Sequence, residues 1–382
     1  MKRTGLVAGS ACALVLTLAT TQAGAVNVLN DKEKDVSLDV AILLQPQMQM
    51  AKDASPDGHL STDFFLRRAR LFVFGKVSKE ISFFVDTDQP NWGKNGVWDT
   101  SMYVQDAVMS WSPDRAFTLD TGLLLVPFSH HALEGAAGLH GLDYHLNVIR
   151  YPAGAGTVLR DTGILARGLL FGDVLHYRLG VFEGVRGPAL PAGVTPAPAP
   201  LNEKGLPRFT GQLRVNVLGS EDRLFLGGIY FADKPMLSFG VGADYQHHAV
   251  RVAGTNEVAD YAALSADVFL EHPLPGDMEI LAKGQFSHID QGAGSASTGN
   301  GAFAEAGFRY AWFEPIVAGE WWKAKDSKLD YLAVKGGVNF WARKHQTNVK
   351  SELGWTETKT PAGTSTTTVH GLTFTVQGQV FF

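Results

Sequence analysis

Residues 208–217 read RFTGQLRVNV, so that apolar residues or glycine alternate with polar residues at every position. Successive side chains of a β-strand point to opposite faces, so this period of two predicts a strand with one apolar and one polar face. The same alternation runs through 36–50 and returns at the end of the chain in 372–382. A strand as long as 36–50 exceeds most strands of soluble proteins. Long alternating strands are typical of a transmembrane β-barrel, which meets lipid outside and water inside.

The whole chain divides into such strands between turn signals. We expect an all-β protein, a single antiparallel transmembrane β-barrel of 16–18 strands, with about eighteen by direct count. The expected strands are 36–50, 64–77, 81–88, 102–111, 117–126, 160–171, 174–182, 207–217, 223–231, 236–245, 248–254, 259–270, 277–288, 301–312, 316–324, 328–341, 347–357 and 368–382. The segment 248–254 has the weakest pattern of these.

The connections between the expected strands alternate in length. One set is long: 51–63, 89–101, 127–159, 183–206, 289–300 and 358–367. The other set is short: 78–80, 112–116, 172–173, 218–222, 246–247, 313–315 and 342–346. An outer-membrane barrel has short periplasmic turns and long outer loops, whereas a soluble β-sandwich has no reason to sort its loops in this way. The parity of the loops therefore favours the membrane barrel and requires an even number of strands.

The first twenty-five residues have the pattern of an export signal. Lys2 and Arg3 precede an uncharged apolar stretch that ends near Thr20, and small residues follow at Ala23 and Ala25. This order predicts a signal peptide, 1–25, and a mature barrel, 26–382. An uncleaved helical anchor is the alternative, but the apolar stretch is short for a bilayer span.

Removal of the signal peptide changes the charge and the cysteine content. Cys12 is the one cysteine of the chain, so the mature protein has no thiol for a metal or for nucleophilic catalysis. Loss of Lys2 and Arg3 leaves thirty-one basic and thirty-eight acidic residues, a net charge of −7. This charge argues against nucleic acid as a partner. We expect the partners to be the lipid bilayer of the outer membrane and small solutes.

Several short segments resemble the phosphate-selective porin O/P family. They are Phe65-Leu66-Arg67-Arg68-Ala69-Arg70, Thr121-Gly122 with Pro127-Phe128-Ser129, Arg160-Asp161-Thr162-Gly163, Tyr177 to Gly184, Gly336-Gly337-Val338-Asn339-Phe340, and the terminal Phe382. Where the family has Asn in the fourth segment, this chain has Glu183. The resemblance implies a water-filled barrel, often a homotrimer, that passes small anions such as phosphate. It also implies sixteen strands, which departs from the count of eighteen.

Basic residues on the expected inward faces are candidates for lining the pore. They are Arg68, Arg70, Arg178, Arg208, Arg214, Lys283, Arg309 and Lys335. Guanidinium groups along a pore would lower the barrier for anions and bind phosphate in a bidentate manner. The same faces carry Asp39, Asp244, Asp267, Glu279, Glu305 and Glu352, so an internally neutralised lumen is an equal alternative. Within 64–77 the strand phase is ambiguous, because adjacent Arg67 and Arg68 should face opposite ways.

The longest connection, 127–159, is the third outer loop and has thirty-three residues. In many porins this loop folds into the lumen, so the family resemblance makes it a constriction candidate. Its polar candidates are His130, His131, Glu134 and Asp143, and it also holds His140 and His145. Their spacing is not that of a metal site, and we assign none. His247 and His248 fall in an expected short turn, where solvated side chains are the ordinary outcome.

Three functions fit a barrel of this kind. The first is a porin for passive diffusion of small hydrophilic solutes. The second is a structural barrel that sheathes a partner such as a multihaem electron carrier; the chain itself has no C-x-x-C-H motif, and we expect no cofactor. The third is an outer-membrane phospholipase, for which His288 and His370 lack a convincing serine partner, although Ser287 is adjacent to His288. We therefore expect no enzyme activity.

Overall fold

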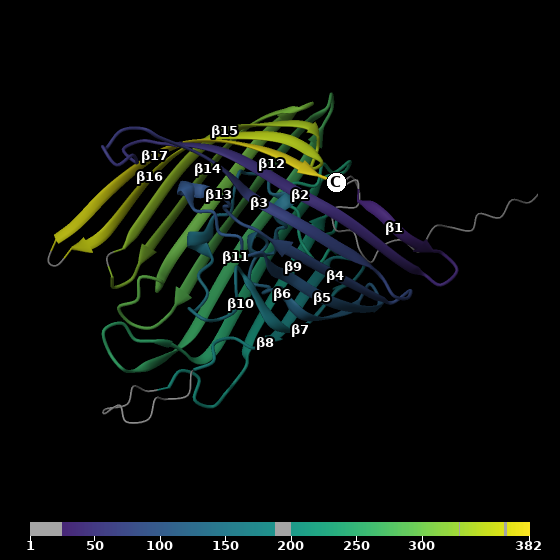
Figure 1. Cartoon of the computed structure of the whole chain (residues 1–382). Coiled ribbons are helices and arrows are strands. Elements are labelled where there is room, and N and C mark those ends of the chain that lie inside the picture. The colour runs from purple at the N-terminus through teal and green to yellow at the C-terminus, as the bar shows by residue number, and fades with distance from the viewer. Residues whose placement is uncertain (1–24, 188–199, 328, 363–364) are drawn as a thin grey trace, which may run out of the picture.

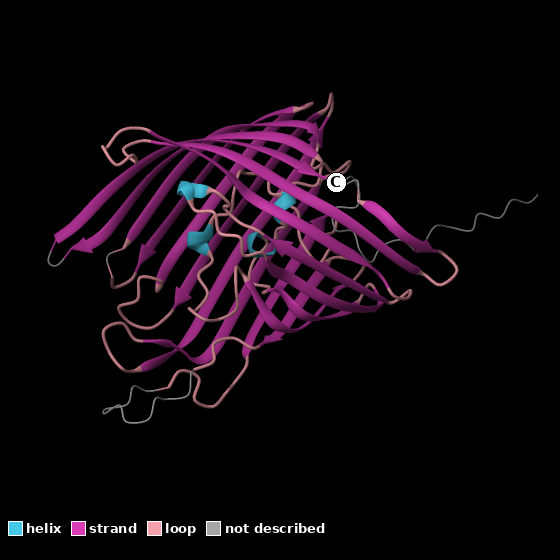
Figure 2. Ribbon diagram, in the orientation of Figure 1, coloured by secondary structure: helices cyan, strands magenta, loops and turns pink. Residues whose placement is uncertain are grey.

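The computed structural model describes residues 25–187, 200–327, 329–362 and 365–382. The expected signal peptide, apart from Ala25, lies outside the described residues. Within these ranges, seventeen strands form one antiparallel sheet, and sixteen of them, β2 to β17, close into a barrel (Figure 1). No helix in the described ranges is long and apolar enough to cross a membrane. Figure 2 shows the short helices in cyan against the magenta strands.

The strands have the following bounds: β1 (Val26–Asp31), β2 (Val36–Ala51), β3 (Ser61–Lys76), β4 (Ile81–Asp88), β5 (Tyr103–Asp114), β6 (Phe117–Leu125), β7 (Arg160–Leu170), β8 (Leu175–Phe182), β9 (Arg208–Leu218), β10 (Met236–Arg251), β11 (Val258–Leu274), β12 (Met278–Asp290), β13 (Gly299–Tyr310), β14 (Phe313–Ala324), β15 (Asp330–Arg343), β16 (Thr347–Ala362) and β17 (Ser365–Phe381). The helices described are single 3-10 turns: η1 (Lys94–Gly96), η2 (His131–Leu133), η3 (Ala136–Gly138) and η4 (Leu146–Val148).

The count of eighteen strands is wrong, and the structure shows where. The segments 236–245 and 248–254 are one strand, β10, whose register shifts at a bulge between Gln246 and Val250. A bulge adds an unpaired residue and interrupts the alternation, which makes one long strand read as two. The segment 223–231 is not a strand but part of a loop inside the barrel. Merging two of the expected strands into β10 and removing 223–231 lowers the count from eighteen to sixteen, which is again an even number.

The barrel closes between its first and last membrane strands. Strand β17 pairs with β2, with Phe381 opposite Leu43, and the Phe382 carbonyl accepts a hydrogen bond from Ile42 N at 2.6 Å. The last strand therefore closes the barrel against the strand expected at 36–50. The sequence did not indicate β1, which pairs with β2 where β17 stops, so that Val26 lies opposite Val40.

The two ends of the barrel differ in their connections. One end, called here the short-turn end, has turns of two to four residues at 77–80, 115–116, 171–174, 275–277, 311–312 and 344–346. The other, called the long-loop end, includes 89–102, 126–159 and 183–207. The sorting of loops by parity holds with two exceptions. The connection 219–235, at the short-turn end, has seventeen residues, and the expected long loop 358–367 is wrong, because β16 and β17 extend to Ala362 and from Ser365.

The two faces of the sheet differ in chemistry as the alternation predicts. In β9 the even-numbered residues from Arg208 to Asn216, including Gln212 and Arg214, are buried, whereas Phe209 and Val217 are about half exposed on the outside. Most of the other barrel strands alternate in the same way, and the exposed outer residues are largely Leu, Val, Phe and Trp. An outward apolar band with inward polar groups is the arrangement that a lipid bilayer requires.

Candidate functional site

The loop 126–159, called here the constriction loop, lies inside the barrel and is bonded to its wall. His130 N donates to the Asp267 carboxylate at 3.0 Å, and Asn147 N donates to Glu320 at 2.9 Å. The Val148 carbonyl accepts a hydrogen bond from Gln285 Nε2 at 3.2 Å. Buried backbone groups need partners, and here side chains of strands β11, β12 and β14 supply them. The loop is therefore fixed across the interior.

Glu134 is the central anion of the constriction loop. Both of its carboxylate oxygens accept from Lys283 Nζ, at 2.8 and 3.0 Å. The imidazoles of His130 and His131 each lie 3.2 Å from it. Burial by itself would raise the pKa of Glu134, but Lys283 and the two imidazoles hold that pKa well below its ordinary value. Glu134 is thus a fixed negative charge that binds Lys283 of the wall.

His140 joins the constriction loop to two carboxylates of the wall. Its Nδ1 lies 2.7 Å from Glu305 and its Nε2 lies 2.9 Å from Glu314. Burial disfavours the charged imidazole, but the two carboxylates outweigh it and raise the pKa of His140 to about 9. His145 lies between Glu305 and Glu320, and its pKa is raised although burial again opposes protonation. The inward glutamates therefore favour the protonated form of both histidines.

Asp143 connects the same loop to β3. Arg67 Nε donates to it at 2.6 Å and Arg68 Nη2 at 2.7 Å. Burial opposes ionisation of Asp143, but the two guanidinium groups lower its pKa. The expectation that Arg67 and Arg68 face opposite ways is therefore wrong. A bulge explains it: the register shifts between Gln45 and Pro46, so Arg67 is the extra residue of β3.

A second loop, 219–235, enters from the short-turn end and is called here the plug loop. It bonds to the constriction loop through backbone groups, with Gly135 N to Leu226 O at 3.0 Å and Leu226 N to Leu133 O at 2.8 Å. Its Glu221 lies 2.8 Å from His130 Nε2 and accepts from Tyr230 Oη at 2.6 Å. The two loops form one hydrogen-bonded unit inside the barrel.

Sequence reasoning missed the plug loop because its apolar residues resemble a strand. Leu224, Leu226 and Ile229 are covered by the barrel interior rather than by a neighbouring strand, and Phe225 packs edge-on against Phe84 with ring centroids 5.2 Å apart. If 223–231 is not counted as a strand, the sequence leaves a long connection between the expected strands 207–217 and 236–245. The length of this connection was the signal that could have indicated an inserted loop.

The eight predicted pore-lining residues all point inward and are held by partners. Seven pair with carboxylates: Arg68 with Asp143, Arg70 with Asp86 and Asp88, Arg208 with Asp244 and Asp161, Arg214 with Asp267 and Glu221, Lys283 with Glu134 and Glu305, Arg309 with Glu279, and Lys335 with Glu352. In the described part of the chain, Arg178 instead donates to the backbone carbonyls of Arg223 and Leu224 in the plug loop. This is the neutralised interior that the sequence left as an alternative.

Water reaches the interior at a group of four charged side chains, called here the eyelet. The exposed fractions of the side chains are 18% for Arg67, 28% for Asp143, 18% for Lys335 and 14% for Glu352. Asp143 is close enough to both Lys335 and Glu352 for electrostatic interaction. The eyelet has two positive and two negative groups, so its field is strong locally but its net charge is zero.

A small cavity lies at the side of the plug loop. Its volume is about 80 Å³, and its lining includes Phe72, Phe74, Phe84, Phe225 and Phe381. The ion pair of Arg160 and Asp106, 2.9 Å apart, borders it. A cavity of this size can hold water or a small apolar group.

Comparisons with known proteins bear on the fold. No family model matches the chain, and no curated protein matches it. Solved structures do: OmpT, an outer-membrane protein of Vibrio cholerae in its trimer form, is 13% identical over 91% of this chain and 99% of that chain, with a TM-score of 0.57. The outer-membrane channel DcaP of Acinetobacter baumannii is 10% identical over 93% and 99%, with a TM-score of 0.57. An anion-selective porin from Comamonas acidovorans is 11% identical over 91% and 100%, with a TM-score of 0.55. The chain has the fold of outer-membrane porins, and membership of the phosphate-selective porin O/P family stays a prediction.

Proposed function

We propose that this protein is an outer-membrane porin for passive diffusion of small hydrophilic solutes, with the long-loop end outside the cell and the short-turn end in the periplasm. The observation that carries the proposal is the constriction loop, which folds into a closed sixteen-strand barrel and leaves a polar eyelet open to water. A loop that narrows a barrel without closing it sets a size limit for solutes.

The proposal has two finer parts, a preference for small anions such as phosphate and assembly as a homotrimer. The anion preference is supported by the similar fold of the anion-selective porin from Comamonas acidovorans, and the homotrimer by the similar fold of the trimeric Vibrio cholerae protein. Both arguments are analogies of fold alone. Arg178, whose described partners are carbonyl groups, adds one inward positive charge without a paired carboxylate. Because the other predicted basic residues are paired, we expect the anion preference to be weak.

Planar-bilayer recording of the refolded barrel tests the proposal. Stepwise, ohmic conductance supports a porin, and its reversal potential in a salt gradient gives the ion preference. A barrel without conductance at any voltage would overturn the porin. A cation preference would overturn the anion part while leaving the diffusion channel.

The runner-up is a structural barrel with little free conductance. It is favoured by the hydrogen-bonded unit of the constriction loop and the plug loop, which buries most inward polar groups. The same unit occupies the space that a sheathed partner would need, so a partner would bind outside the lumen. A silent barrel that co-purifies with another protein would support this function.

We propose no catalytic role for the strand histidines. His288 Nδ1 lies 2.8 Å from Asn300 Oδ1 at an exposed position. Ser287 faces the interior and accepts a hydrogen bond from Gln285 at 2.8 Å, so it is not within reach of that imidazole. His370 lies near Glu357 and stacks on Trp355. Hydrolysis of phospholipid by the purified barrel would contradict this.

A further inference from the structure

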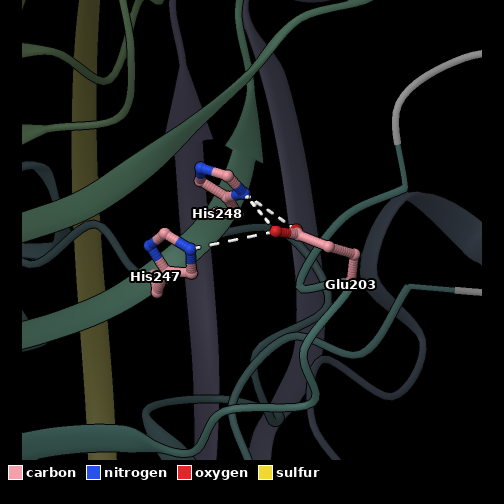
Figure 3. Close-up of side chains that lie close together, drawn as sticks. All are labelled: Glu203, His247 and His248. Carbon is pink, nitrogen blue, oxygen red and sulfur yellow. Dashed lines mark hydrogen bonds and ion pairs between the residues drawn. The ribbon is translucent and has the colours of Figure 1, made fainter.

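Two adjacent histidines gather beside a glutamate near the long-loop end. His247 and His248 lie near the end of β10, and Glu203 lies in the loop 183–207 (Figure 3). Neighbouring residues of a regular strand point to opposite faces, but the bulge in β10 and a φ of 46° at His248 bring both rings to one side. The rings stack with their centroids 3.8 Å apart. A non-glycine residue with positive φ is uncommon in a strand and often marks a functional position.

Three possible ligand atoms converge in this cluster. His248 Nδ1 lies 2.8 and 2.9 Å from the two Glu203 oxygens, and His247 Nε2 lies 3.9 Å from Oε1 of the same carboxylate. All three ligand atoms lie within 4.8 Å of one another. His247 Nε2 is buried and has no hydrogen-bond partner. A buried ring nitrogen that faces a carboxylate without a bond has a free position for a ligand.

A second carboxylate orients the cluster. Asp260 Oδ1 lies 2.9 Å from His247 Nδ1 and accepts from His248 N at 2.9 Å. Tyr245 Oη donates to the other Asp260 oxygen at 2.8 Å. A proton on His247 Nδ1, held by Asp260, leaves the lone pair on Nε2. Metal-binding histidines commonly have such a carboxylate behind them, which fixes the tautomer and the ring.

We propose that Glu203, His247 and His248 form a site for a divalent transition metal, with Zn²⁺ as the ion it fits best. His247 Nε2, His248 Nδ1 and one Glu203 oxygen would be the ligands, with water in the fourth position. Two imidazoles and one carboxylate suit Zn²⁺, whereas Ca²⁺ and Mg²⁺ prefer oxygen ligands. Binding through His248 Nδ1 would require the lone pair on this atom, with the proton of the imidazole on Nε2. It would tie the loop 183–207 to β10, a role independent of the proposed porin function.

Titration of the refolded, chelator-treated barrel with ZnCl₂ tests this inference. We expect one tight equivalent per chain, and at least tenfold weaker binding in His247→Ala, His248→Ala and Glu203→Gln. Asp260→Asn should weaken binding by about tenfold or more while leaving the three ligands in place. His59→Ala, which removes an exposed histidine of the loop between β2 and β3, is the matched control and should bind as the unaltered protein does.

Cobalt provides a second measurement that does not depend on the variants. Co²⁺ in the unaltered barrel should give the visible absorbance of a tetrahedral site, and Zn²⁺ should remove it. Absence of tight Zn²⁺ binding, or of a tetrahedral Co²⁺ spectrum, would overturn the site. Binding that is unchanged in His247→Ala and His248→Ala would place the metal at another position of the chain and would also overturn the site.

Discussion

At the scale of the residue, the interior is governed by pairing. Its arginines and lysines form ion pairs with aspartates and glutamates, as Lys283 does with Glu134. The loop residue His140 lies against two further carboxylates, those of Glu305 and Glu314. A buried charge without a partner costs several kcal/mol, so each charge in the interior constrains its neighbours. The variable that matters for ion passage is therefore the arrangement of the four partly exposed charges at the eyelet, and not the number of basic residues in the chain.

The eyelet gives the first prediction. Lys335→Gln removes a positive charge and should shift the reversal potential in a salt gradient towards cation preference. Glu352→Gln removes the carboxylate that lies 3.7 Å from Lys335 Nζ, and should shift the reversal potential towards anion preference. Both side chains are only partly exposed, so salt screens them less than surface charges. Lys359→Gln, on β16 with a more exposed side chain, is the control. Shifts of the same sign in both eyelet variants would show that solutes pass elsewhere.

His140 gives a prediction about pH. Its pKa of about 9 exceeds the ordinary value of 6.5, so its contribution to loop anchoring is complete below pH 6.5 and is lost as pH rises through 9. Loss of its proton leaves Glu305 and Glu314 without that cation, although Lys350 still donates to the carbonyls of Leu139 and Gly141. We expect noisier single-channel current at pH 10 than at pH 7. His140→Gln should be noisy at both values; an equally quiet His140→Gln channel would contradict this.

At the scale of the element, the plug loop determines how open the barrel is. Replacing 223–232 with a short glycine turn removes the backbone bonds of the plug loop to the constriction loop and the contacts of Arg178 with the carbonyl groups of Arg223 and Leu224. We expect single-channel conductance to rise severalfold while the barrel stays folded, because strand pairing of β9 with β10 does not involve this segment. Shortening the loop 252–257 is the control. Unchanged conductance would mean that the constriction loop alone sets the opening.

Elements also show how far the sequence predicts the structure. Alternation located fifteen of the sixteen barrel strands closely, because lipid on one side and a polar interior on the other impose a period of two. The two errors, the extra strand 223–231 and the division of β10 into two strands, arose where a contrast between lipid and a polar interior does not set the pattern. Leu226 is apolar because the interior covers it, and His248 interrupts β10 because a bulge changes the side on which residues lie.

The site was predicted less well than the strands, for a related reason. The inward direction of Arg208 and Arg214 follows from alternation, but their partners Asp244 and Asp267 depend on register. The long loop 127–159 was recognised by length, whereas the contacts of Glu134 with Lys283 join residues that no local pattern connects. The cluster of Glu203, His247 and His248 likewise appears only when the loop 183–207 is placed beside β10.

At the scale of the whole molecule, the barrel combines an apolar outer band with a polar interior of balanced charge. The outer band explains why a sequence with mean hydropathy near zero can form a membrane protein. The filled interior makes the protein more rigid than an empty barrel, since the two inner loops connect strands on opposite sides. We expect solutes to be selected by size first and by charge second.

Strand β1 has a consequence for the connectivity of the chain. It pairs with the same edge of β2 as β17 does and runs in the same direction, with Val26 opposite Val40 and Phe381 opposite Leu43. Phe382 is hydrogen-bonded to Ile42, so one residue opposite Ala41 separates it from Val26 in this register, and a one-residue connection would make β17 and β1 one uninterrupted strand. The two ends of the chain therefore meet along β2, where β1 continues the pairing that β17 begins. A circular permutant with new ends in the loop 252–257 should refold in detergent to a heat-modifiable barrel; a permutant that never becomes heat-modifiable would show that the original ends are needed for assembly.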